Sequence, residues 1–327
     1  MKLRFLSALT TALLILILLL VASLGVGPYK VYSPHALVRA VFEEGPDRAV
    51  IEYRLWRSIA AFILGLGLAV SGLALQRLIN NPLADPYILG ISSGASLGFL
   101  AAVALGLKPL WVWYLAAFSG GLLAYTVIVA VATALGLTGL GLIVSGVSLT
   151  YAFTGVSMIL IYVMGPQIQF GFSWLFGSVA YSTRDVIVAS TFLTLTGLAI
   201  IAYYRGSLTT LLLGEDVARA LGVKVHMVKL IVSASIALIV ASLVAVSGPV
   251  GFIGLIAPWI ARLAVGAGFT RLLPLTAAAG ASLGLASDIL VRIAGGGREL
   301  PLTALTAIIG APLLFYLTLK TKGVERL

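Results

Sequence analysis

This chain contains ten apolar runs, separated by short charged or Gly/Pro-rich segments. The runs are residues 5–26, 58–79, 95–107, 113–137, 142–164, 186–204, 228–246, 256–265, 273–293 and 302–319. Apolar residues make up 61% of the 327 positions, against about 45–50% in an ordinary soluble domain. About 20 apolar residues are enough to cross the hydrocarbon layer as a helix. The sequence therefore predicts an all-α integral membrane protein with ten transmembrane helices and a single domain, residues 1–327.

The first run could also be read as a secretory signal, because Lys2 and Arg4 precede it. The apolar region of a signal peptide has about 7–15 residues and leads to a small-residue cleavage site. Residues 5–26 form a longer run, and no clear cleavage site follows it. We therefore expect a retained first span.

The distribution of Lys and Arg predicts the orientation of the chain in the membrane. With the N-terminus inside, alternate segments place twelve of the 21 basic residues in the cytoplasm and nine outside, most of these in one long loop. Cytoplasmic loops carry the excess of Lys and Arg in membrane proteins. We expect a multi-pass protein of the cell membrane with both termini cytoplasmic. The same rule explains the net charge of +10, so the lipid bilayer is the expected partner and nucleic acid is not.

Two of the runs, residues 95–107 and 256–265, are too short to cross about 30 Å of hydrocarbon as plain helices. Gly/Pro-rich stretches precede both, at residues 81–86 and 248–251. They are the third and eighth runs. Because successive spans cross the membrane in opposite directions, two spans that are five apart cross it in opposite directions. Interrupted helices at matching positions of two halves indicate an inverted internal repeat, although Gly and Pro are also common in membrane helices generally.

The energy source is constrained by what the sequence lacks. No G-x-x-x-x-G-K-[ST] motif occurs, so the chain has no P-loop with which to hydrolyse ATP. Ion-coupled carriers usually place carboxylates or histidines within the spans. Here Asp288 is the only acidic residue in a predicted span, and Arg292 lies one turn away. A local i,i+4 contact explains that pair at least as well as a proton relay, so coupling to an ion gradient is disfavoured.

Enzymatic roles are also disfavoured. The chain has no Cys and only two His, far apart in sequence, so no metal site is expected. An intramembrane enzyme would need paired acid and base residues or metal ligands, and no such set is evident. We expect no catalytic residues.

The most informative polar segment is residues 213–223, LGEDVARALGV. Two acidic residues open a short helix at its positive end, and Gly222 can close it in the left-handed conformation. Val217, Ala218 and Leu221 would give it an apolar face able to enter a groove on a soluble partner. An ordinary amphipathic connector is the alternative.

Together with other stretches, this segment resembles the permease subunits of ABC importers for iron-siderophore, haem and cobalamin. The matching stretches follow the family's order along nearly the whole chain: Arg54-Leu55-Trp56-Arg57, Ser71-Gly72 with Gln76, residues 81–86 with 89–95, 174–178, 248–262 and 299–312. Trp56 stands where the family commonly has proline, and Trp259 where histidine is common. We therefore assign to this chain no role that depends on the replaced side chains.

The resemblance implies a type II ABC importer permease. Such a permease is a homodimer of ten-span subunits around a central pathway, with two ATP-binding subunits beneath and an extracytoplasmic substrate-binding protein above. No cofactor would be bound by this chain, and ATP and Mg would be held by the partner ATPase. The ATPase-coupling residues would be Gly214, Glu215, Asp216, Val217, Ala218, Arg219, Ala220, Leu221 and Gly222.

The resemblance also assigns residues to docking of the binding protein. By motif position these would be Arg57 and Arg292, since guanidinium pairs bidentately with carboxylate. Interfacial snorkelling is the alternative for both side chains.

For the pathway, the fifth run carries hydroxyl residues in two helical stripes, Ser145 with Ser148 and Thr150 with Thr154 and Ser157. These stripes could line the pathway, as that helix does in the family, or serve close helix packing. By family position the gate would be Thr138, Gly139 and Gly141. The expected function is therefore import of an iron-siderophore, haem or cobalamin-like metal chelate, and the alternative is an ion-coupled secondary transporter.

Overall fold

The computed structural model of the chain describes residues 2–33, 35–37, 39, 45–136, 140–165, 174–266 and 268–321. Within these ranges the regular elements are all helical. They are α1 (Lys2–Gly25), α3 (Pro46–Ile79), η1 (Pro86–Leu89), α4 (Ile91–Ala104), α5 (Leu110–Ala134), α6 (Leu140–Met164), α8 (Arg184–Tyr203), α9 (Arg205–Thr210), η3 (Leu211–Leu213), α10 (Glu215–Ala220), α11 (Val225–Ser247), α12 (Ile253–Val265), α13 (Phe269–Ala294) and α14 (Leu302–Thr321). Each of the ten predicted spans corresponds to one of these helices, so the all-α membrane fold is confirmed.

The largest difference from the sequence prediction is the start of α3, at Pro46 rather than at residue 58. Its 34 residues would extend about 51 Å at 1.5 Å per residue, against about 30 Å of hydrocarbon. Its first turns carry charged residues, and hydropathy detects only the part that lies in lipid. Proline at the first helical turn is a favoured start, because its missing N–H has no intrahelical partner there.

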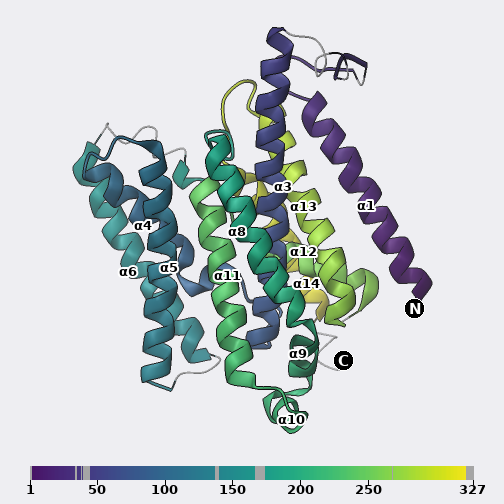
Figure 1. Cartoon of the computed structure of the whole chain (residues 1–327), viewed down its shortest axis with the longest axis vertical. Coiled ribbons are helices and arrows are strands. Elements are labelled where there is room, and N and C mark those ends of the chain that lie inside the picture. Colours follow the sequence, from purple (N-terminus) through teal and green to yellow (C-terminus); the bar gives the residue numbers. More distant parts are fainter. Residues whose placement is uncertain are drawn as a thin grey trace.

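Two helices form the centre of the bundle, α3 and α11, whose apolar windows are 83% and 72% buried. Helix α3 packs on α12 and α13, and α11 packs on α4 and α5. The two central helices run in opposite directions (Figure 1). In each half, therefore, the second span contacts the third and fourth spans of the other half. This reciprocal arrangement is the one that an inverted repeat produces.

Glycines allow the closest helix pairs to approach. On α3, a Cβ added at Gly65 would lie 2.1 Å from the carbonyl oxygen of Gly280 on α13. Between α4 and α5, a Cβ at Gly94 would lie 2.5 Å from the carbonyl oxygen of Gly120. Within lipid the hydrophobic effect does not drive helices together, so their association depends on close packing at small residues such as these.

The two interrupted segments meet inside the protein. The first passes through η1 and turns into α4 at Gly90, whose φ is 67°. The second enters α12 through Phe252, whose φ of 70° is uncommon for a bulky residue. The hydroxyl of Tyr87 in η1 accepts a hydrogen bond of 2.8 Å from the backbone N–H of Val250. A side chain of the protein thus forms a hydrogen bond with a backbone N–H group that lipid could not satisfy.

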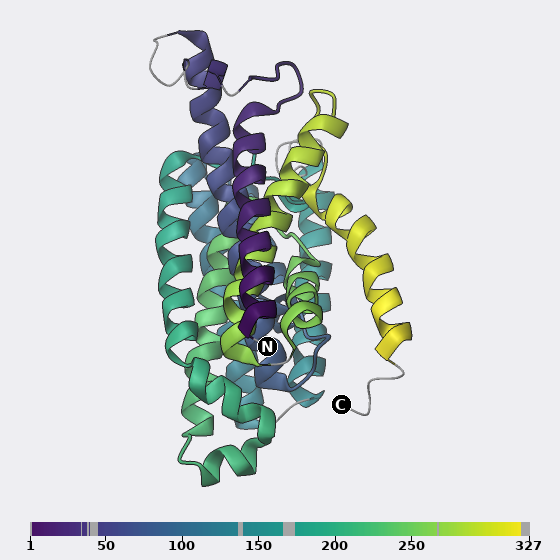
Figure 2. The same ribbon diagram turned by 90° about the vertical axis from the view of Figure 1, so that its right-hand side faces the viewer.

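The ends of the chain define the two sides of the bundle. Figure 2 shows that α1 begins, and α14 ends, toward the end of the bundle at which α10 lies. The start of α1 and the end of α14 therefore lie on the same side of the bundle as α10.

Candidate functional site

The segment between α8 and α11 forms a short helical elbow, made of α9, η3 and α10, at one end of the bundle (Figure 2). Gly214, with φ 101°, precedes α10. Beyond the helix, Gly222 has φ 83° and its N–H donates to the carbonyl of Arg219 at 3.0 Å, while the N–H of Val223 donates to the carbonyl of Ala218 at 2.9 Å. The predicted helix and its glycine termination are confirmed.

The three apolar residues predicted to form one face, Val217 and Ala218 of α10 and Leu221 just after it, are separated in the structure. Ala218 is fully buried, whereas Val217 and Leu221 are 44% and 64% exposed. Adjacent residues of an α-helix point about 100° apart, so the packing of α10 on α9, η3 and α11 buries one position and exposes its neighbour. Leu213, just before the helix, is 63% exposed. We call Leu213, Val217 and Leu221 the apolar tip.

Charged residues tie α10 to itself and to α11. Arg219 donates to Asp216 at 2.7 Å and to Glu215 at 3.1 Å, and Glu215 also forms an ion pair with Lys229 on α11. The sequence did not predict the pair with Lys229, because a separation of fourteen residues does not by itself indicate a contact. Exposed pairs contribute only about 0–1 kcal/mol to stability. The ion pair of Glu215 with Lys229 therefore joins α10 to α11 while contributing little to overall stability.

A crevice of about 460 Å³ lies beside the elbow, between α5 and α11. Glu215 and Lys229 line it on the elbow side, together with Arg77 from the end of α3. On its wall, the hydroxyls of Tyr125 and Ser233 are hydrogen bonded at 2.8 Å and join α5 to α11. The elbow is thus not packed solidly against α5.

At the opposite end of the bundle, two arginines and two acidic side chains form a largely buried cluster. Arg57 Nε donates to Asp288 at 2.8 Å, and Arg57 Nη2 donates to Glu299 at 3.1 Å. Asp288 also pairs with Arg292, whose guanidinium donates to the carbonyl of Ser23 at 2.8 Å and to its hydroxyl at 2.7 Å. The i,i+4 contact between Asp288 and Arg292 is confirmed. The sequence did not indicate the pairing of Arg57 with either carboxylate.

This cluster bears on the predicted docking residues. Arg57 and Arg292 are only 6% and 5% exposed, and Asp288 is fully buried. Docking stays a prediction for both arginines. In this conformation their guanidinium groups are paired within the chain.

The end of α1 and the residues just after it, up to Lys30, are bound by a third buried arginine. Arg54 donates to the backbone carbonyls of Leu24, Gly25 and Lys30 at 3.1, 2.8 and 2.8 Å. Lys30 in turn donates to Asp47 at 2.7 Å, and this hydrogen bond raises the pKa of Lys30 above its ordinary value. The R-x-x-R stretch thus places one arginine under the loop and one in the ionic cluster.

The hydroxyl residues of α6 differ in their surroundings. Ser148 is exposed, whereas Ser145, Thr150 and Thr154 are half-buried and Ser157 is 7% exposed. The hydroxyl oxygens of Thr150 and Ser157 are themselves buried, and no hydrogen-bond partner is found for them in the described part of the chain. Ser157 therefore packs against protein rather than facing an open pathway in this conformation.

The predicted gate is only partly visible. Gly141 lies in the first turn of α6, and Thr138 and Gly139 lie outside the described residues. The gate assignment stays a prediction.

The two tryptophans that depart from the family pattern have contacts of their own. The ring of Trp56 lies 4.9 Å from the guanidinium of Arg184. Trp259 Nε1 donates to the carbonyl of Pro82 at 3.2 Å, and its ring lies 5.1 Å from the guanidinium of Arg262. Both rings therefore contribute a cation–π contact with an arginine to the packing of the bundle.

The fold can be compared with known families. The sequence profile of the FecCD transport family matches residues 14–320 of the chain. The chain belongs to the FecCD transport family. This FecCD protein is 35% identical over 271 residues to a cobalamin import system permease protein of Halobacterium salinarum, covering 81% of this chain and 71% of that one. It is 29% identical to an Fe(3+)-citrate import system permease protein of Bacillus subtilis, over 87% of this chain and 86% of the relative. A vitamin B12 import system permease protein of Yersinia pseudotuberculosis is 33% identical, over 98% and 94% of the two chains.

Solved structures agree with this assignment. A metal-chelate type ABC transporter in an inward-facing conformation superposes on this FecCD protein with a TM-score of 0.86 and 32% identity, covering 95% of this chain and 98% of that one. PsaBC of Streptococcus pneumoniae, at 16% identity and a TM-score of 0.56, shares the fold. The FecCD protein is therefore a transmembrane permease subunit of an ABC importer.

Proposed function

We propose that this FecCD permease moves a metal chelate of the iron-siderophore, haem or cobalamin type into the cytoplasm. The observation that carries the proposal is the apolar tip, which is exposed at one end of the helical bundle. The class of solute is suggested by two relatives, which are named for cobalamin and Fe(3+)-citrate import. The working importer would contain two copies of this chain, two ATP-binding subunits and an extracytoplasmic substrate-binding protein. Both termini would be cytoplasmic, and ATP with Mg would be bound by the partner ATPase rather than by this chain.

In this proposal, residues Gly214 to Gly222 couple ATP hydrolysis to transport. The apolar tip would enter a groove of the ATPase, and closure of the ATPase pair would move α10. Two contacts would pass that motion to the bundle: buried Ala218, and the ion pair from Glu215 to Lys229 on α11. Because α11 packs on α3, α4, α5 and α8, its movement reaches both halves. The crevice beside the elbow offers volume for such a shift between two states.

The other predicted sites fit the same cycle. A carboxylate of the binding protein that approaches Arg57 would compete with Asp288 and Glu299, so docking would be accompanied by an exchange of ion pairs. The pathway would run along the exposed face of α6 that carries Ser148, and the gate would be formed by Thr138, Gly139 and Gly141, the last of which lies in the first turn of that helix.

The experiment is uptake of a labelled metal chelate into proteoliposomes that contain this permease with its ATPase and binding protein. We expect uptake only when Mg-ATP is present on the side of the membrane where the ATPase is bound. A proton or sodium gradient alone should give no uptake. Uptake on an ion gradient without ATP would overturn the proposal and establish the secondary-transporter alternative.

A paired variant tests the coupling step. Val217→Glu with Leu221→Glu replaces two members of the apolar tip by charges and should lower uptake at least tenfold. The swap Val217→Leu with Leu221→Val keeps the tip apolar and should retain uptake. Unchanged uptake by the glutamate variant would remove the coupling role.

A further inference from the structure

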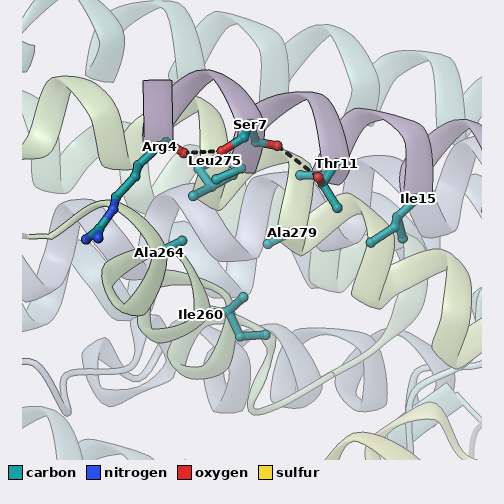
Figure 3. Close-up of a pocket in the computed structure, with 10 residues that line it drawn as sticks. Arg4, Ser7, Thr11, Ile15, Ile260, Ala264, Leu275 and Ala279 are labelled. Carbon is teal, nitrogen blue, oxygen red and sulfur yellow. Dashed lines mark hydrogen bonds between the residues drawn. The ribbon is translucent and has the colours of Figure 1, made fainter. Parts of the chain in front are cut away.

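A groove between α1 and the pair α12 and α13 takes no part in the proposed import cycle (Figure 3). It has a volume of about 490 Å³. One wall is the face of α1 from Arg4 to Ile15, and the opposite wall carries Ile260 of α12 with Leu275 and Ala279 of α13.

The wall formed by α1 is apolar in effect. Its two hydroxyl residues are bonded to the backbone of their own helix: Ser7 donates to the carbonyl of Arg4 at 3.0 Å, and Thr11 donates to the carbonyl of Ser7 at 2.8 Å. Figure 3 shows these bonds lying along α1. The hydroxyls are therefore satisfied without an occupant, and the groove presents methyl and methylene groups.

The length and place of the groove match one leaflet of a bilayer. From Arg4 to Ile15 the helix rises about 16 Å at 1.5 Å per residue, close to half of the roughly 30 Å hydrocarbon layer. The apolar window of α1 is 0% buried, so this helix lies at the periphery of the bundle. The occupant of the groove is consequently drawn from the bilayer.

Positive charge lies at the mouth of the groove, on the side of the bundle where α10 lies. Arg4 is exposed and extends from α1 toward α12 near Ala264 (Figure 3). Arg271 lies one helical turn before Leu275 and so on the same face of α13. No carboxylate pairs with either guanidinium among the described residues. Two unneutralised cations at the membrane surface favour an anionic headgroup.

We propose that this groove binds one acyl chain of an anionic phospholipid from the leaflet on the α10 side, with the phosphate held by Arg4 and Arg271. The lipid fills the space that helix packing leaves between α1 and α12, and so holds the peripheral first span against the bundle. The inference requires that the chain spans a membrane, and it does not depend on which solute is imported.

The test measures lipid binding by the purified full chain in detergent, using native mass spectrometry and thermal unfolding. Phosphatidylglycerol should remain bound and raise the melting temperature, and phosphatidylcholine of the same acyl chains should bind at least tenfold more weakly. Equal binding of the two lipids would overturn the anionic headgroup, and equal binding of a free fatty acid would overturn the phospholipid.

Variants locate the lipid. Arg4→Gln with Arg271→Gln should abolish the preference for phosphatidylglycerol, while Arg205→Gln, an exposed arginine on α9 at the same end, should retain it. Ala264→Phe places a ring at the exposed mouth, where overpacking is small, and should lower binding of both lipids; Ala264→Ser should not. Retained phosphatidylglycerol preference in the arginine variant, or retained binding in Ala264→Phe, would overturn the site.

Discussion

Asp288 shows how a single residue can connect distant parts of the chain. Its carboxylate, fully buried, accepts from Arg57 of α3 and from Arg292 of its own helix. Sequence spacing predicts the contact within α13, because i and i+4 lie on one helix face. The contact with Arg57 joins residues 231 positions apart and depends on the packing of α3 on α13, which spacing cannot show. The paired carboxylate is also poorly suited to a proton relay, since two guanidinium groups hold it.

Removing this carboxylate should destabilise the permease. Asp288→Asn removes the carboxylate that pairs with Arg292 and leaves Arg57 with Glu299 alone, and breaking a buried pair costs about 3–5 kcal/mol. We expect a loss of that order in the free energy of unfolding, measured in denaturing detergent. Asp185→Asn at the exposed start of α8 is the matched control and should change it little. A stability for Asp288→Asn equal to that of the control would show that the ion cluster is not structural.

At the scale of the elements, hydropathy predicted the spans and the two interruptions well, because lipid imposes both. It missed the charged first turns of α3, which lie beyond the lipid. For α10, the sequence predicted the helix and its terminating glycine correctly. The prediction that Ala218 belongs to an exposed apolar face was wrong, because its burial depends on how α10 packs on α9, η3 and α11. Local capping is encoded in adjacent residues, whereas the orientation of a short helix is decided by its neighbours.

The ion pair between α10 and α11 gives an element-scale prediction. Glu215→Lys should uncouple the two helices and lower transport severalfold at preserved ATP hydrolysis, with a change in stability of less than about 1 kcal/mol, since both side chains are partly exposed. Adding Lys229→Glu restores an attractive pair and should recover transport. Uptake and ATP hydrolysis by the same proteoliposomes measure both quantities. If the double variant were no better than the single one, the position of α10 would not depend on this pair.

For the whole molecule, the inverted repeat follows from the reciprocal packing of α3 and α11, and the sequence had indicated it from two short runs alone. The charge distribution further predicts that the α10 side is cytoplasmic. The chain contains no cysteine, so an introduced thiol reports its own location.

Labelling with a membrane-impermeant maleimide tests this orientation. A cysteine introduced by Tyr29→Cys, at a position 85% exposed between α1 and α3, should react in intact cells. One introduced by Leu221→Cys should react only after the membrane is opened. The reverse pattern would place the apolar tip outside and remove it from any ATPase.

The hydrogen bond between Tyr87 and Val250 has a consequence for how such a bundle can move. It joins the interrupted segment of one half, at η1, to the interrupted segment of the other half, just before α12. Bending of one half at its interruption would strain this contact with the other half, so we expect the two interruptions to move together. Tilting of the halves would be expected to leave this point nearly still while the helix ends travel furthest.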